Sequence, residues 1–172
     1  MGKMKKLWVF GLTVFMAGLV AFVAGCDSEI GDSCSANVDC SSNGDRLCDT
    51  SQPGGYCTVE GCSATSCPGG SVCVAFFPTS TLETPCEPAT EDRLGDDAAT
   101  DDCAFYEVCL TSGFCAPASL ERRYCMKKCG GGGDCRDKYE CRTTGELGSQ
   151  KVPRSSQDYS NVGETRFCVA EE

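Results

Sequence analysis

Seventeen cysteines are the residues of this chain best suited to chemistry, and one of them stands apart from the rest. Cys26 ends the stretch 23–26, which reads Val-Ala-Gly-Cys and follows three lysines before residue 7 and an apolar run over 7–23. Small residues before a cysteine suit a peptidase that cuts next to a lipid-modified thiol. The pattern therefore predicts lipidation of Cys26 and a structural role for the other sixteen cysteines.

Residues 1–26 resemble the lipobox signal of bacterial lipoproteins. The resemblance implies removal of residues 1–25 and a mature N-terminus at Cys26 that carries acyl chains such as palmitate. Several acyl chains on one residue hold a protein on a membrane more firmly than a single chain does. Two other interpretations are open: an ordinary secretory signal, and an uncleaved membrane helix, since the apolar run is nearly long enough to span a bilayer. All three export the chain.

Export places the remaining sixteen cysteines in an oxidising compartment, where an even number predicts a disulfide framework of up to eight bridges. The mature chain has few large aliphatic residues for its length and many Gly, Ser, Thr and Asp residues. We therefore expect no single large core. Disulfides should supply much of the stability, at about 2–4 kcal/mol each.

The composition argues against most enzyme classes. The chain has no histidine, which excludes Ser-His-Asp and Cys-His catalysis and histidine ligands for zinc. No Cys-x-x-Cys motif occurs, which argues against thiol redox, zinc and iron–sulfur sites. We expect no enzymatic activity, no cofactor and no metal. Calcium is the one alternative, at the acidic residues of 91–102 or at Asp39, Asp45 and Asp49, although no EF-hand pattern is present.

The negative charge lies in the first half of the mature chain. Removal of the signal leaves 12 basic and 25 acidic residues, a net charge of −13. Residues 27–102 contain two basic and fifteen acidic residues, whereas residues 103–172 contain ten of each. Neither nucleic acid nor an anionic lipid surface is therefore an expected partner of the first half.

The sixteen cysteines form four sets of four, each with short early gaps and a variable last gap. The sets are Cys34, Cys40, Cys48 and Cys57; Cys62, Cys67, Cys73 and Cys86; Cys103, Cys109, Cys115 and Cys125; and Cys129, Cys135, Cys141 and Cys168. The stretches 47–57 and 108–115 share an apolar residue, a cysteine, a Thr-Ser pair and a closing Gly-aromatic-Cys. Each predicts a small β-hairpin with its turn at the polar residues.

An interleaved pairing fixes both ends of a hairpin that lies between the last two cysteines of a set. It predicts the pairs Cys34–Cys48, Cys40–Cys57, Cys62–Cys73, Cys67–Cys86, Cys103–Cys115, Cys109–Cys125, Cys129–Cys141 and Cys135–Cys168. Spacing alone does not select among the three pairings open to four cysteines. The match between 108–115 and 47–57 makes Cys103 equivalent to Cys40, and it leaves no equivalent of Cys34 in the third set. Either Cys86 or Cys125 therefore completes this set.

This spacing resembles the four-cysteine repeats of envelope lipoproteins in myxobacteria and related delta-proteobacteria, and more loosely EB-module and Dickkopf-type modules. The residues that carry the likeness are the first set, which ends in Gly-Tyr-Cys57, and the run from Cys62 through Pro68 to Cys73. The resemblance implies a surface or envelope interaction protein, in some cases one linked to motility.

These patterns together predict a small disulfide-rich fold of tandem four-cysteine modules, with short β-hairpins, long loops and little helix outside the signal peptide. The expected segments are a signal peptide (1–25), a lipidated tether (26–33), modules one and two (34–86), an acidic linker (87–102) and modules three and four (103–172). We expect the modules to contact mainly their neighbours, with one helical turn near 119–124. The loop 143–165 is expected to be disordered. The segment 75–78 is either a core strand or an exposed tip.

The expected function is that of a non-enzymatic, membrane-anchored interaction, adhesion or structural module of the bacterial envelope. Its expected partner is another envelope protein, which binds a basic cluster formed by Arg122, Arg123, Lys127 and Lys128, with the acidic half as a stalk. The same cluster also fits docking on the chain's own acidic half, or a solvated surface. The competing function is a protease inhibitor or toxin-like module that uses the loop 143–165. An outer-membrane or surface location is favoured, while Asp27 after the lipidated cysteine resembles an inner-membrane retention signal; the oligomeric state is open.

Lipidation is tested by replacing Cys26 with serine and labelling cells with a palmitate analogue. We expect label on the wild-type protein and none on Cys26→Ser, which should accumulate in an unprocessed or soluble form. Equal labelling of the two proteins would contradict the lipobox interpretation.

Overall fold

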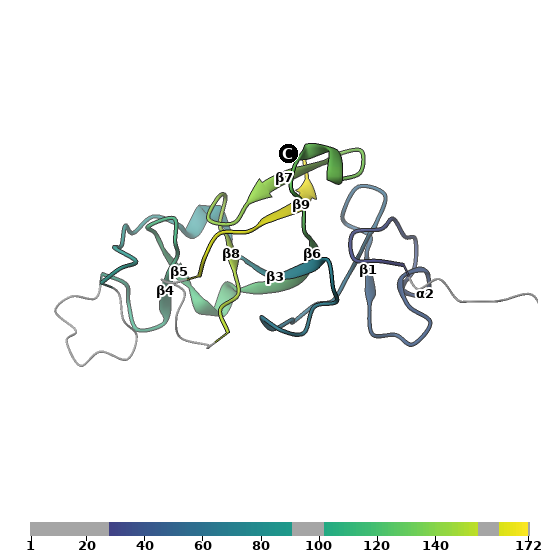
Figure 1. The fold of residues 1–172 in the computed structure, drawn as a ribbon. Coiled ribbons are helices and arrows are strands. Elements are labelled where there is room, and N and C mark those ends of the chain that lie inside the picture. The colour runs from purple at the N-terminus through teal and green to yellow at the C-terminus, as the bar shows by residue number, and fades with distance from the viewer. Residues whose placement is uncertain (1–27, 91–101, 155–161, 172) are drawn as a thin grey trace, which may run out of the picture.

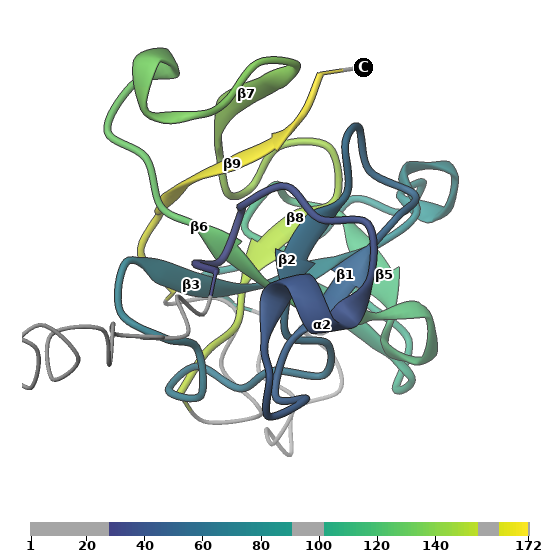
Figure 2. The same ribbon diagram turned by 90° about the vertical axis from the view of Figure 1, so that its right-hand side faces the viewer.

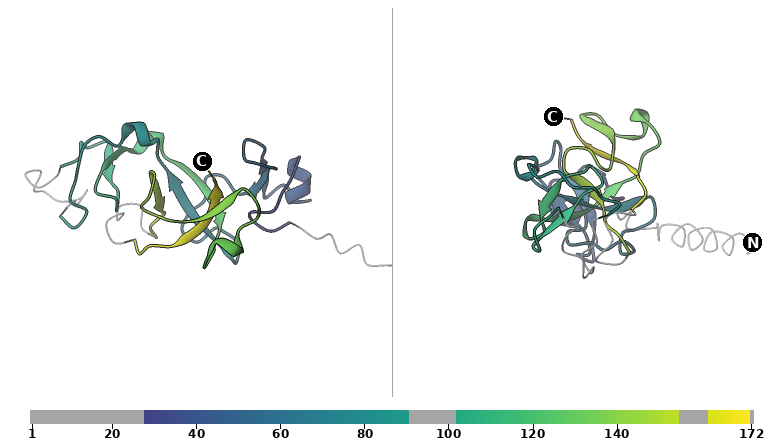
Figure 3. Two further views of the ribbon diagram at one scale, coloured as in Figure 1. Left: turned by 90° about the horizontal axis from the view of Figure 1, so that it is seen from above. Right: turned by 90° about the vertical axis from the view of Figure 1, so that its left-hand side faces the viewer.

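The computed structural model describes residues 28–90, 102–154 and 162–171. Cys26, most of the acidic linker 87–102 and part of the loop 143–165 lie outside the described residues. The described residues form an elongated molecule, with α2 and β1 at one end and β4 and β5 at the other (Figures 1 and 3). Among these residues, no helix has the length and apolar character needed to cross a bilayer.

The elements are short strands with very little helix. In chain order they are α2 (Asn37–Cys40), β1 (Leu47–Asp49), β2 (Tyr56–Thr58), β3 (Ser71–Phe76), η1 (Thr79–Thr81), β4 (Glu107–Cys109), β5 (Cys115–Pro117), η2 (Ala118–Leu120), β6 (Arg122–Lys127), η3 (Gly132–Asp134), β7 (Tyr139–Thr143), β8 (Ser149–Lys151) and β9 (Arg166–Ala170). The predicted fold class, a small disulfide-rich protein of tandem cysteine modules with short hairpins, is confirmed. The turn expected near 119–124 is a 3₁₀ turn at 118–120, which β6 follows directly.

Both predicted hairpins are present. β1 pairs with β2, and β4 pairs with β5, each over three residues in antiparallel register. The glycine of each Gly-aromatic-Cys motif has a positive φ, 69° at Gly55 and 80° at Gly113, in the left-handed region that glycine adopts most readily. The segment 75–78 begins in β3, and Phe77 is buried, so it is part of the core and not an exposed tip.

Eight disulfides link the sixteen cysteines, and six of them are the predicted pairs. The predictions Cys67–Cys86 and Cys109–Cys125 are wrong. The structure contains Cys67–Cys125 and Cys86–Cys109 instead. The reason is strand pairing at long range: β6 pairs with β3 along its whole length and sets Cys125 directly opposite Cys73.

With this correction all four modules share one topology, in which the first cysteine is bonded to the third and the second to the fourth. We name them module A (Cys34, Cys40, Cys48, Cys57), module B (Cys62, Cys67, Cys73, Cys125), module C (Cys86, Cys103, Cys109, Cys115) and module D (Cys129, Cys135, Cys141, Cys168). In each, the third and fourth cysteines are register partners across an antiparallel strand pair. Module C is inserted between the last two cysteines of module B.

The insertion removes the expected boundary between the segments 34–86 and 103–172. The central sheet has the strand order β6-β3-β8, so that a strand from the first segment lies between two from the second (Figure 2). Cys67–Cys125 adds a covalent link over a sequence separation of 58 residues. The modules are therefore not strung along the chain with contacts to neighbours alone.

A large hydrophobic cluster surrounds this sheet, contrary to the expectation of no large core, and a smaller one consists of the four cysteines of module A. The large cluster includes Tyr56 from module A, Val74 from module B, Leu110 from module C and Phe167 from module D, each at most 2% exposed. Residues 26–172 have too few large apolar residues for four separate cores. They supply one large core because every module contributes to the same place.

The predicted tether and the loop expected to be disordered are both hydrogen bonded to the modules where the structure describes them. In the predicted tether, Ile30 is buried, and the Gly31 N–H donates a hydrogen bond of 2.9 Å to the Cys57 carbonyl. In the predicted disordered loop, β8 joins the central sheet, and the buried Gln150 accepts a hydrogen bond of 2.7 Å from the Thr111 hydroxyl. Residues 143–154 and 162–165 are thus ordered, and 155–161 lie outside the described residues.

Two glycines with similar backbone angles provide a matched test of packing in module A. A methyl group at Gly55 would lie 2.0 Å from the Cys34 carbonyl oxygen, whereas one at Gly44 (φ 75°) would meet nothing within 4 Å. Both alanine variants carry the left-handed backbone penalty of about 1–2 kcal/mol, but only Gly55→Ala adds a clash. We expect Gly55→Ala to lower the free energy of unfolding by at least about twice as much, as measured by thermal unfolding without reductant. Equal losses would show that the hairpin does not need this close approach.

Candidate functional site

The chain next to Cys26 is fastened to module A. The Ser28 hydroxyl donates a hydrogen bond of 2.7 Å to the Asp39 carbonyl, and the Arg46 guanidinium donates to the Ser28 carbonyl. Cys26 itself lies outside the described residues, but only Asp27 separates it from Ser28. Ser28, the first described residue after the lipidation candidate, is therefore held at the end of the molecule formed by module A (Figure 1).

The predicted basic cluster is not one surface. Three of its members, Arg122, Arg123 and Lys127, lie on β6, and Lys128 follows directly. Because side chains alternate along a strand, residues 122 and 128 face one side of the sheet while 123 and 127 face the other. The Arg123 guanidinium also binds the Glu121 carboxylate at 2.8 and 2.9 Å. The four residues therefore do not form the single partner-binding face expected of them.

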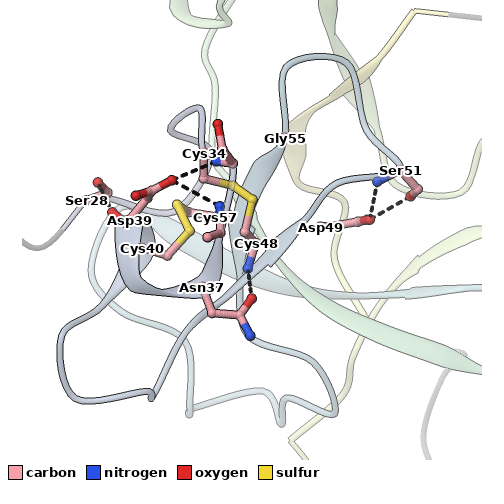
Figure 4. Close-up of a disulfide and its surroundings, with 12 residues drawn as sticks. Ser28, Cys34, Asn37, Asp39, Cys40, Cys48, Asp49, Ser51, Gly55 and Cys57 are labelled. Carbon is pink, nitrogen blue, oxygen red and sulfur yellow. Dashed lines mark hydrogen bonds between the residues drawn. A yellow bond between two sulfur atoms is a disulfide. The ribbon is translucent and has the colours of Figure 1, made fainter.

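The residue before the second cysteine has the same role in all four modules. Its side-chain oxygen accepts a hydrogen bond from the backbone N–H of the residue that follows the first cysteine. The four bonds are Ser35 to Asp39 at 2.8 Å, Ser63 to Ser66 at 2.8 Å, Glu87 to Asp102 at 3.1 Å and Gly130 to Asp134 at 2.7 Å. Figure 4 shows this bond in module A, beside the two disulfides. Cysteine spacing does not predict these bonds. The sequence does carry a signal for them, because an Asp or Ser stands before each second cysteine.

These bonds also explain the electrostatics of two carboxylates. Hydrogen bonds from the N–H groups of Ser35 and Ala36 lower the pKa of the Asp39 carboxyl from its ordinary value of 3.8. The equivalent N–H groups of Gly130 and Gly131 lower the pKa of the Asp134 carboxyl in the same way. Both carboxylates thus hold the loop between the first two cysteines of their module.

The carboxylates considered for calcium are engaged in their own turns. Asp39 accepts hydrogen bonds from the two N–H groups already described, and Asp45 accepts one from the Ser41 hydroxyl. Asp49 accepts hydrogen bonds from both the N–H and the hydroxyl of Ser51. In the described part of the chain, only cysteine triplets bring three ligand atoms within 4.8 Å of one another. Their sulfur atoms are bonded in disulfides and offer no thiolate for a metal.

An aromatic residue precedes the fourth cysteine in every module, and its environment differs. Tyr56 in module A and Phe167 in module D are 2% and 0% exposed. The Tyr56 hydroxyl accepts a hydrogen bond of 2.9 Å from the Lys127 N–H, and its ring stacks on Tyr139 at 5.4 Å between centroids. Burial raises the pKa of Tyr56 to about 12. In these modules the aromatic side chain is covered by a neighbouring module.

Module C, which has no module beyond it, leaves its aromatic residues exposed. Phe114, the equivalent of Tyr56, is 39% exposed. Nearby in the sequence, Phe105 is 100% exposed and Tyr106 is 69% exposed. Module C occupies the end of the molecule opposite module A (Figure 1). We call Phe105, Tyr106 and Phe114 the module C aromatics.

Comparison of the chain with protein-family models, with curated proteins and with solved structures finds no match.

The carboxylates of Asp39 and Asp134 should make stability depend on acidic pH. Because hydrogen bonds depress their pKa values in the folded state, their contribution is present above the unfolded value of 3.8 and is lost as pH falls through the lower folded values. We expect Asp39→Ala with Asp134→Ala to lower the midpoint of unfolding at pH 7 and to flatten its fall between about pH 4 and pH 2. Denaturant titrations across this range measure both effects. Asp137→Ala, an exposed position of the same module, is the control; an unchanged slope in the double variant would contradict the assigned role.

Proposed function

We propose that the mature protein is a non-enzymatic lipoprotein of the bacterial envelope that is anchored through Cys26 and presents module C to another envelope protein. One observation carries this proposal: the chain after the predicted lipid site is fastened to one end of an elongated molecule, and the module C aromatics lie at the opposite end. The module A end therefore suits attachment to the membrane, and the module C end suits binding of a partner.

The short connection to the lipid places module A next to the membrane. Two residues of extended chain span at most about 7 Å, so Ser28 lies close to the acylated cysteine. Residues 28–58 contain five carboxylates and one arginine. An anionic lipid surface repels this charge over a Debye length of about 8 Å at physiological salt. The repulsion favours a molecule that stands away from the bilayer instead of lying flat on it.

The exposed aromatics suit a protein partner. Aromatic side chains each bury about 150–250 Å² and dominate the energetics of many protein interfaces. In modules A and D the equivalent side chains are already buried, so the exposure in module C reflects its position at the end of the molecule. The Cys86–Cys109 and Cys103–Cys115 disulfides hold the backbone around them. A surface fixed in this way loses little conformational entropy on binding.

The protease-inhibitor alternative has less support. It requires the loop 143–165 to enter a target, but β8 within this loop is hydrogen bonded to β3, and Ser149 and Gln150 are buried. The enzymatic alternative lacks histidine and any recognised arrangement of nucleophile and base. We favour a location in the outer membrane or on the cell surface. Retention in the inner membrane, which Asp27 would signal, is the alternative.

Photo-crosslinking at two matched positions tests the proposal. A photoreactive amino acid replaces Phe105 at the module C end or Val38, an exposed residue of module A that is 76% accessible. In intact cells we expect a discrete crosslinked protein from position 105 and none of the same mass from position 38. Phe105→Ser with Tyr106→Ser and Phe114→Ser should abolish co-purification of that protein, whereas Val38→Ser should not. Crosslinks of equal mass and yield from both positions would contradict recognition through module C.

A further inference from the structure

A cavity of about 490 Å³ lies beside β3 where β8 ends. β8 pairs with residues 74–76 of β3, and no β8 residue lies opposite residues 71–73. Residues 71–73 therefore line the cavity. The chain leaves the sheet after Lys151, held by a hydrogen bond of 3.1 Å from the Val152 N–H to the Cys73 carbonyl. The shortness of β8 therefore creates the cavity.

The wall of this cavity is cationic. Its charged lining residues are Lys128, Lys151 and Arg154, and no carboxylate belongs to the lining drawn from the described residues. The mature chain has twelve basic residues and a net charge of −13, so three of the twelve meet at one concavity of an acidic protein. A concave surface lined by one sign of charge concentrates its field and attracts ions of the opposite sign.

The backbone of two of these cations is held by the central sheet and its flank. The Lys128 N–H donates a hydrogen bond of 2.9 Å to the Gly70 carbonyl, and Lys151 lies opposite Val74 in the sheet. The side chain of Val152 is buried in the core between Lys151 and Arg154. Cys67 and Cys73, which also line the cavity, are each bonded in a disulfide of module B. Lys128 and Lys151 are thus presented from a backbone that is already in place, a property that reduces the cost of binding.

We propose that this cavity binds a phosphate ester carried by a small polar molecule. A guanidinium binds phosphate through two parallel hydrogen bonds, and lysine ammonium groups supply additional point charges. A phosphate monoester carries close to two negative charges at pH 7, which matches a site with three cations. The volume falls in the range of about 300–1,000 Å³ found for small-molecule sites, so there is room for more than the phosphate group alone. This site is independent of the module C aromatics.

Titration of the mature chain carrying Cys26→Ser tests the site, with glucose 6-phosphate as the probe and glucose as the neutral control. We expect saturable binding of glucose 6-phosphate that weakens as salt rises, and no binding of glucose. Lys151→Ser with Arg154→Ser should weaken binding at least about tenfold, since each removes a charge-assisted hydrogen bond. The control Arg122→Ser with Lys138→Ser makes the same change in net charge away from the cavity and should leave the affinity within about twofold.

A second arm identifies the source of the phosphate. Binding to phosphatidylglycerol vesicles but not to glucose 6-phosphate, with loss in the Lys151/Arg154 variant, would assign the site to a lipid headgroup. Binding to glucose 6-phosphate alone would assign it to a soluble ester. Absence of saturable binding to either probe, or equal weakening by the two double variants, would overturn the proposal. Circular dichroism and a free-thiol assay confirm that both variants remain folded and oxidised.

Discussion

The structure depends on one repeated interaction, the placement of two cysteines opposite each other on antiparallel strands without a bond between them. In module A, Cys48 faces Cys57, yet Cys48 is bonded to Cys34 and Cys57 to Cys40. A bond across the strand pair would only reinforce a hairpin that backbone hydrogen bonds already define. The interleaved bonds instead attach the preceding loop to both strands, so that a hairpin of three-residue strands becomes a closed unit. Isolated two-stranded hairpins are marginal in water, and the bridges supply what the strands lack.

The same interaction also allows modules to be combined. In module B the two facing cysteines belong to strands far apart in sequence, β3 and β6, and the space between them in the chain is filled by module C. The pairing of these strands brings apolar residues of all four modules around one sheet. Tyr56 illustrates the result, because its hydroxyl contacts the Lys127 N–H of module B's strand and the Cys168 carbonyl of module D. Disulfides and a shared core therefore act together in this protein.

Local features of the fold could be predicted from the sequence, and long-range features could not. The stretch Gly55-Tyr56-Cys57 predicts its hairpin because turn chemistry and β-propensity act over a few residues. The match between 108–115 and 47–57 leaves Cys86 or Cys125 to complete the third set, and only the pairing of β3 with β6 shows that Cys125 belongs with Cys67. The order within 143–154 has a similar origin: β8 is polar, with sequence Ser-Gln-Lys, and gains its structure from β3 and from Thr111. The exposure of Phe114 could not be predicted from the sequence either, because it depends on whether another module packs against module C.

The insertion of module C into module B imposes an order on disulfide formation wherever the chain is oxidised as it emerges from its N-terminus. The N-terminal part of a chain emerges first, so module A can close once residue 57 has appeared, and Cys62–Cys73 can form soon afterwards. Cys67 then remains a free thiol while the four cysteines of module C arrive, because its partner lies 58 residues away. Cys86 reaches Cys67 earlier and by a shorter loop, which makes it the kinetically favoured wrong partner. A Cys67–Cys86 bond formed in this way has to be reopened by thiol–disulfide exchange before Cys125 can reach Cys67, so a disulfide isomerase, as well as an oxidant, would assist oxidation of this chain.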